Sequence, residues 1–169
     1  GLLSGFGHPV IGVDHLAAIV GVGILAAIAG RSAAVVLAFS VAVMAGVGLH
    51  LGQVDLPASE LFVGLTTLLI GALVIARQTM GAGLALLLFA VAGLVHGYAL
   101  GESIVGAEAS PLVAYLLGLL VIQSAIGVVV YGAVRTLAHW PARTAGLTAV
   151  GVLVALAGGI ATASAAGLT

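Results

Sequence analysis

The sequence predicts an all-α integral membrane protein, a bundle of about six transmembrane helices with both termini on the outer side. Of its 169 residues, 63% are hydrophobic and 5% are charged, whereas about a quarter of the residues are charged in soluble domains. Nine charged side chains cannot form a water-facing surface around a domain of this size. The apolar stretches reach the roughly 20 residues that a spanning helix needs, and they lack the alternation of barrel strands.

Breaks rich in Gly, Pro or charge divide the chain into six apolar segments, which we treat as one transmembrane domain over 1–169. Pro9 favours the start of the first helix, because the first turn makes no use of the missing N–H. Ser59 is placed to cap the third helix, and Pro111 opens the fifth. We expect helices at about 9–30, 32–51, 59–75, 80–100, 112–134 and 144–163.

Loop charges separate by sign along this helix pattern. The basic residues fall in loops on one side, at Arg31, Arg77, Arg135 and Arg143. The acidic residues on the other side are Asp55, Glu60, Glu102 and Glu108. Because cytoplasmic loops of membrane proteins are enriched in Lys and Arg, we expect the arginine loops in the cytoplasm and both termini outside.

Composition also limits the partners. The chain has no cysteine, so disulfides, thiolate metal sites and Cys nucleophiles are excluded. A net charge of −1 provides no basic surface for nucleic acid. The lipid bilayer is an expected partner, and a homo-oligomer is compatible with the sequence.

Ionisable groups within the apolar segments are candidates for function, because each costs a few kcal/mol to insert in a bilayer. Four of the five histidines lie toward the outer side. Imidazole and carboxylate ligands together suit Ni²⁺, Co²⁺, Zn²⁺ and Mn²⁺. The candidate metal ligands are His8, Asp14, His15, His50, Glu60, His96 and Glu102.

Helix geometry restricts how these residues could meet. His8 and His15 lie about 10 Å apart along a straight helix, so they share an ion only if the segment unwinds. Gly12 would permit such a break. The six-residue spacing of His96 and Glu102 raises the same problem, and Gly97 and Gly101 are possible breaks there. Either broken helices surround one metal site, or the ligands form successive sites along a path.

Each candidate also has a structural interpretation. Asp14 and His15 could form a buried ion pair, and His96 could be a core histidine with satisfied hydrogen bonds. His50 could lie at the membrane interface. Glu60 could be an acid favoured by the dipole at a helix N-terminus.

His8-Pro9-x-x-Gly12-x-Asp14-His15 resembles the first-helix signature of the HupE/UreJ family. Leu56 to Glu60, His96 to Gly101 and Pro111 to Gly127 are similar to further segments of that family. The resemblance implies a secondary transporter of Ni²⁺ or Co²⁺ in a bacterial inner membrane. It also implies transport roles for His8, Asp14 and His15, followed by Glu60 and Glu102. Many members carry a cleaved signal peptide, which would fit a start at Gly1, as would a trimmed chain.

The sequence departs from the common family pattern at three positions. Tyr98 and Leu100 replace histidines in the fourth helix, and Gln123 replaces a histidine found in the fifth helix of some members. The stretch from His96 to Ser103 is closer to cyanobacterial members, which favours Co²⁺.

The leading hypothesis is therefore a metal permease that is not an enzyme and holds no prosthetic group. No GxxxxGK[ST] motif for ATP is present. The first alternative is an intramembrane zinc hydrolase, although HExxH and GxSxG motifs are absent. The second is a non-transporting metal-binding accessory protein, which metal accumulation in cells would distinguish from a transporter.

Overall fold

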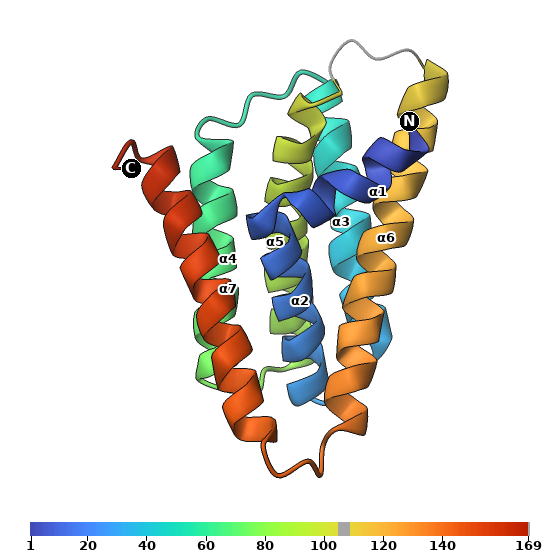
Figure 1. Cartoon of the computed structure of the whole chain (residues 1–169). Coiled ribbons are helices and arrows are strands. Elements are labelled where there is room, and N and C mark those ends of the chain that lie inside the picture. The colour runs from blue at the N-terminus through green and yellow to red at the C-terminus, as the bar shows by residue number, and fades with distance from the viewer. Residues whose placement is uncertain (105–108, 169) are drawn as a thin grey trace.

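The computed structural model describes residues 1–104 and 109–168, and its regular structure there is entirely helical (Figure 1). Glu108, expected in an outer loop, lies outside the described residues. The helices are α1 (Leu2–Ile11), α2 (Val13–Ile28), α3 (Ala33–Leu51), α4 (Ser59–Ile75), α5 (Ala82–Glu102), α6 (Ala109–Thr136) and α7 (Arg143–Ala165).

The length and composition of these helices confirm a helical membrane protein. Among the described residues, four helices are long and apolar enough to cross a bilayer, namely α3, α5, α6 from Pro111, and α7. The bent pair of α1 and α2 qualifies as a fifth span when taken together. The apolar α4 has 17 residues, which is about 25 Å of helix and near the lower limit for a span.

The first helix differs from the expected single helix over 9–30. The chain becomes helical at Leu2, α1 ends at Ile11, and α2 leaves at an angle of 82°. Pro9 lies in the last turn of α1 rather than at a helix start. Gly12 takes an extended conformation at the bend (φ −69°, ψ 101°), so the helix breaks where the sequence allowed a break.

The second break that the sequence allowed, near Gly97 and Gly101, does not occur, because α5 is continuous to Glu102. Both glycines serve close packing instead. A Cβ at Gly97 would collide with the backbone of Val43 in α3, and one at Gly101 would collide with His50. Small residues of this kind let membrane helices approach closely.

A second close pair is formed by α4 and α7. Gly64 lies against the backbone of Thr162, and Gly71 lies against Ala155. Figure 1 shows α7 beside α4 at one edge of the bundle, with α6 and α1 at the other. The bend between α1 and α2, together with α5, lies between these edges, and this arrangement places the polar residues described below.

The loop between α3 and α4 corrects the expected cap at Ser59. The N-cap of α4 is Ala58, which has a left-handed backbone (φ 58°), and Ser59 is the first helical residue. Its hydroxyl instead donates a hydrogen bond to Glu102 Oε1 at 3.2 Å. The side chain thus joins the outer ends of α4 and α5 rather than capping its own helix.

Charges of opposite sign occupy opposite ends of the bundle. Arg31 follows α2, Arg77 follows α4, and the α6–α7 connection lies between Arg135 and Arg143. Both chain termini lie at the other end (Figure 1). Asp55, Glu60 and Glu102 belong to that end as well, since they follow α3, begin α4 and end α5.

Candidate metal site

Two histidines from different helices meet inside the bundle. His15 lies in the first turn of α2 and His96 lies in α5, and their Nδ1 atoms are 2.8 Å apart. The ring centroids are 4.9 Å apart at an angle of 75°. His96 is 1% exposed, and Phe39 of α3 packs edge-on against its ring. The site is therefore held by three helices.

The spacing of the two nitrogens has a chemical consequence. At 2.8 Å a single proton is shared between them, so one ring donates and the other accepts. Two ring nitrogens about 2.0–2.1 Å from one metal ion would be about 2.9–3.3 Å apart, depending on the coordination angle. The observed separation is close to that range, so an ion could be bound by both atoms if the two rings turned their lone pairs toward it.

Asp14 lies beside this pair at the start of α2. Its Oδ1 accepts a hydrogen bond from the backbone N–H of His15 at 2.9 Å. Its backbone carbonyl lies 3.4 Å from the hydroxyl of Thr67. The carboxylate thus satisfies a free N–H of the first helical turn, where a negative charge is favoured.

His8 lies apart from the pair, on the other side of the bend. Its Nδ1 is 3.1 Å from Ser103 Oγ and 3.1 Å from Tyr115 Oη. The break at Gly12 therefore does not bring His8 and His15 onto one ion. A pocket of about 620 Å³ opens beside it, lined by Leu3, Ser4, Gly7, His8, Ile11 and Gly12.

His50, near the outer end of α3, packs against Tyr98 with ring centroids 4.6 Å apart. Its Nδ1 is buried and has no hydrogen-bond partner in the part of the chain that the structure describes. Tyr98 donates a hydrogen bond to the carbonyl of Val54 at 2.8 Å and accepts one from the N–H of Leu56 at 3.1 Å. Tyr98 therefore anchors the loop between α3 and α4, which is a structural role.

Glu60 and Glu102 are both exposed at the outer end of the bundle. Ser59 joins Glu102 to the start of α4.

The seven candidate ligands do not converge on one point. Within residues 1–104 and 109–168, no group of three or more His, Asp or Glu side chains is close enough to hold one ion. The structure brings together His15 and His96, with Asp14 adjacent, and leaves His8, His50, Glu60 and Glu102 around them. Of the two arrangements the sequence allowed, this geometry favours successive sites.

Four polar residues within the apolar helices were not singled out from the sequence as site residues. Thr66 and Thr67 of α4 each place Oγ1 3.3 Å from Nε2 of His96. Ser40 and Gln123 are each 1% exposed, and neither Ser40 Oγ nor Gln123 Nε2 has a hydrogen-bond partner among the described residues. The available signal was a polar side chain inside an apolar helix, which in a membrane calls for a partner.

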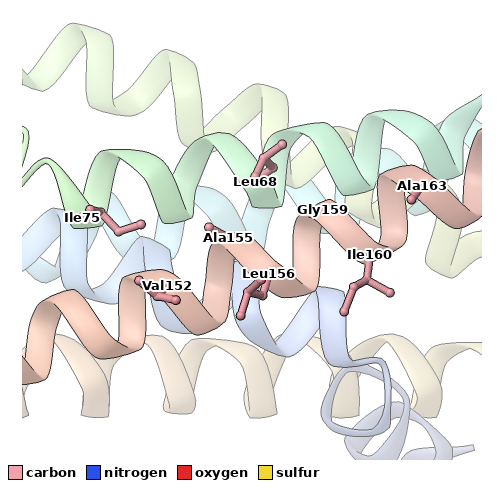
Figure 2. Close-up of a pocket in the computed structure, with 8 residues that line it drawn as sticks. All are labelled: Leu68, Ile75, Val152, Ala155, Leu156, Gly159, Ile160 and Ala163. Carbon is pink, nitrogen blue, oxygen red and sulfur yellow. The ribbon is translucent and has the colours of Figure 1, made fainter.

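A groove between α4 and α7 offers nothing to a metal ion. Figure 2 shows its lining, which is apolar throughout and encloses about 440 Å³. The lining residues are Leu68, Ile75, Val152, Ala155, Leu156, Gly159, Ile160 and Ala163. A hydrated cation would find no ligand among these residues, so this groove is not a candidate metal site.

The fold and the histidine pair define a polytopic helical membrane protein with two neighbouring imidazole groups inside its bundle. A family model described as HupE / UreJ protein matches residues 1–161. The chain is 33% identical to Protein HupE of Rhizobium leguminosarum bv. viciae over 131 residues, which cover 76% of this chain and 69% of that protein. The chain belongs to the HupE/UreJ family. No solved structure matches it.

Family membership confirms the resemblance seen in the sequence. At the level of the family it supports a role in metal transport.

Proposed function

We propose that this protein is a secondary transporter that takes up Ni²⁺ or Co²⁺ through a path centred on His15 and His96. The observation that carries the proposal is the 2.8 Å contact between their Nδ1 atoms inside the bundle. Two neutral imidazoles suit both metals. Water and nearby carboxylates would complete the coordination shell, because two ring nitrogens fill only part of it.

The proposed path begins at the end that carries Glu60 and Glu102. The exposed carboxylates raise the local concentration of cations. His8 lies next, beside the pocket along α1, and Asp14 stands at the entrance to the histidine pair. Successive weak sites suit transport, since an ion must be able to leave each ligand set.

The energy for uptake would come from gradients. A divalent ion that moves inward across about 100 mV gains roughly 4.6 kcal/mol. This direction requires the arginine loops to face the cytoplasm, as the positive-inside rule indicates. We accordingly place the protein in a bacterial inner membrane.

The geometry supports the hydrolase alternative less well. A catalytic zinc ion is held by three protein ligands, and no group of three lies within reach of one ion among the described residues. A site formed by two histidines suits an ion that must move on along a path. The accessory-protein alternative makes a different prediction, namely binding without movement across the membrane.

Metal uptake into proteoliposomes tests the proposal directly. Co²⁺, Ni²⁺, Zn²⁺ and Mn²⁺ would be offered separately to vesicles with an inside-negative potential, and internal metal would be measured by mass spectrometry. We expect accumulation of Co²⁺ or Ni²⁺ that is lost in His96→Ala vesicles. Binding to the detergent-solubilised protein without any accumulation would favour the accessory-protein alternative.

A further inference from the structure

The two ring nitrogens of His96 face different partners. Nδ1 faces Nδ1 of His15 at 2.8 Å. Nε2 faces the hydroxyl oxygens of Thr66 and Thr67, each at 3.3 Å. The ring is 1% exposed and Thr67 is fully buried, so these contacts replace water. In a neutral imidazole one nitrogen carries the proton and the other carries the lone pair.

The threonine hydroxyls have nearer acceptors for their own protons. Thr66 Oγ1 donates to the carbonyl of Phe62 at 2.8 Å, and Thr67 Oγ1 donates to the carbonyl of Val63 at 2.9 Å. This bond to the carbonyl four residues earlier is a common one for threonine in helices. A hydroxyl has one proton, so each oxygen presents a lone pair to Nε2 of His96.

We propose that Thr66 and Thr67 are positioning residues that hold His96 with its proton on Nε2, so that Nδ1 is the atom that binds the transported ion. The assignment of Nδ1 as a metal ligand rests on the proposed function, whereas the assignment of the proton does not. Metal-binding histidines commonly have their second nitrogen fixed in this way by an oxygen acceptor.

The same arrangement fixes the proton on His15. Since Nδ1 of His96 accepts, Nδ1 of His15 donates across the 2.8 Å contact. An ion entering between the two atoms replaces that proton. The proton then moves to Nε2 of His15, which leaves both rings neutral and both Nδ1 lone pairs on the ion. Entry of the ion therefore needs no change of net charge in the pair.

Nitrogen NMR of the full chain without metal tests this assignment. The protein would be labelled with ¹⁵N-histidine, treated with a chelator and studied in micelles near pH 8, with each ring assigned by a single His→Asn substitution. We expect His96 to be protonated at Nε2 and His15 at Nδ1. In the double variant Thr66→Val/Thr67→Val this pattern of protonation should be lost, because valine removes both hydroxyl acceptors and keeps the shape of the side chains.

Two control variants distinguish the loss of the hydroxyl acceptors from a general disturbance of the fold. Thr66→Ser/Thr67→Ser keeps both oxygens and should keep the wild-type protonation. Thr148→Val removes a similar hydroxyl, which bonds the carbonyl of Thr144 at 3.0 Å on α7, and should change nothing. If the double valine variant fails to fold, the two single valine variants replace it, since each removes one acceptor.

Co²⁺ titration provides the second measurement. Affinity for Co²⁺ should fall on the order of tenfold in the valine variant and return in the serine variant. Wild-type protonation of His96 at Nδ1, or unchanged protonation in the valine variants, would overturn the proposal, as would altered protonation with unchanged Co²⁺ affinity. Wild-type protein that shows the expected protons but binds neither Co²⁺ nor Ni²⁺ would refute the proposed function and leave the proton assignment standing.

Discussion

Gly97 of α5 packs directly against the backbone carbonyl of Val43 in α3, with no room for a side chain between the helices. Because His96 is the preceding residue, this approach fixes the depth of its ring in the bundle. We expect Gly97→Ala to push the two helices apart, to destabilise the fold by about 1–3 kcal/mol and to reduce metal binding. Thermal unfolding in detergent and Co²⁺ titration measure the two effects.

The matched control for this substitution is on the same helix. A Cβ at Gly83 would meet nothing within 4 Å. Gly83→Ala should therefore leave binding unchanged and stabilise α5 by up to about 1 kcal/mol, because alanine restricts the unfolded chain. Equal behaviour of the two variants would show that the contact between α3 and α5 is not tight.

The pairing of His15 and His96 predicts that loss of either ring abolishes transport. His15→Ala should reduce uptake into proteoliposomes by at least on the order of tenfold to a hundredfold, since half of the ring ligands disappear. Asp14→Asn should also reduce uptake, because the charge at the entrance is lost. Both proteins should still insert, as judged by their yield in the membrane fraction and by circular dichroism.

His139 provides the control on the opposite side of the membrane. It is exposed, in the turn between α6 and α7 that lies at the arginine end. His139→Ala should transport as the wild type does. Wild-type uptake in both His15→Ala and Asp14→Asn would show that the start of α2 is not part of the ion path.

The distribution of arginines predicts the orientation in the membrane. Since the chain has no cysteine, a single introduced cysteine reports its own side. Arg31→Cys should be protected from an impermeant thiol reagent added outside intact cells, whereas Asp55→Cys should be labelled. Labelling of Arg31→Cys from outside would contradict the assigned orientation and with it the direction of uptake.

Composition and length were sufficient to predict membrane helices, because every spanning helix must satisfy its backbone internally and present apolar side chains to lipid. The sequence also marked Gly12 as a point where the first segment could break. It did not show that α1 begins at Leu2, since Pro9 looked like the start of a helix. Pro9 is instead tolerated within the last turn of α1, just before the chain bends.

The contact between His15 and His96 could not be predicted, because the two residues are 81 positions apart. It depends on α5 packing along α3 through glycines, and on α2 turning inward after the bend. The role of Thr66 and Thr67 was hidden for a similar reason. In the sequence, each looks like a threonine whose hydroxyl bonds a backbone carbonyl of its own helix. Only the position of His96 shows that a lone pair of each hydroxyl oxygen also faces a ring nitrogen.

Metal binding should weaken as the pH falls, because a ring nitrogen that binds a metal cannot also carry a proton. Histidine has an ordinary pKa of about 6.5, so protons compete with the ion mainly between about pH 5 and 7. Near pH 8 the rings are already neutral, and the ion should displace almost no protons to the buffer. Lowering the pH should reduce affinity for Co²⁺ and increase the number of protons released.

Calorimetric titrations in buffers of different ionisation enthalpy would count these protons at pH 5.5 and at pH 8. If carboxylates alone held the ion, affinity would stay flat down to about pH 5 and fall only as Asp and Glu become protonated. A proton count near zero at both pH values would therefore remove His8, His15 and His96 from the ligand set. A count that rises toward acid and disappears in His15→Ala would assign the competition to the pair inside the bundle, since His8 and His50 remain in that variant.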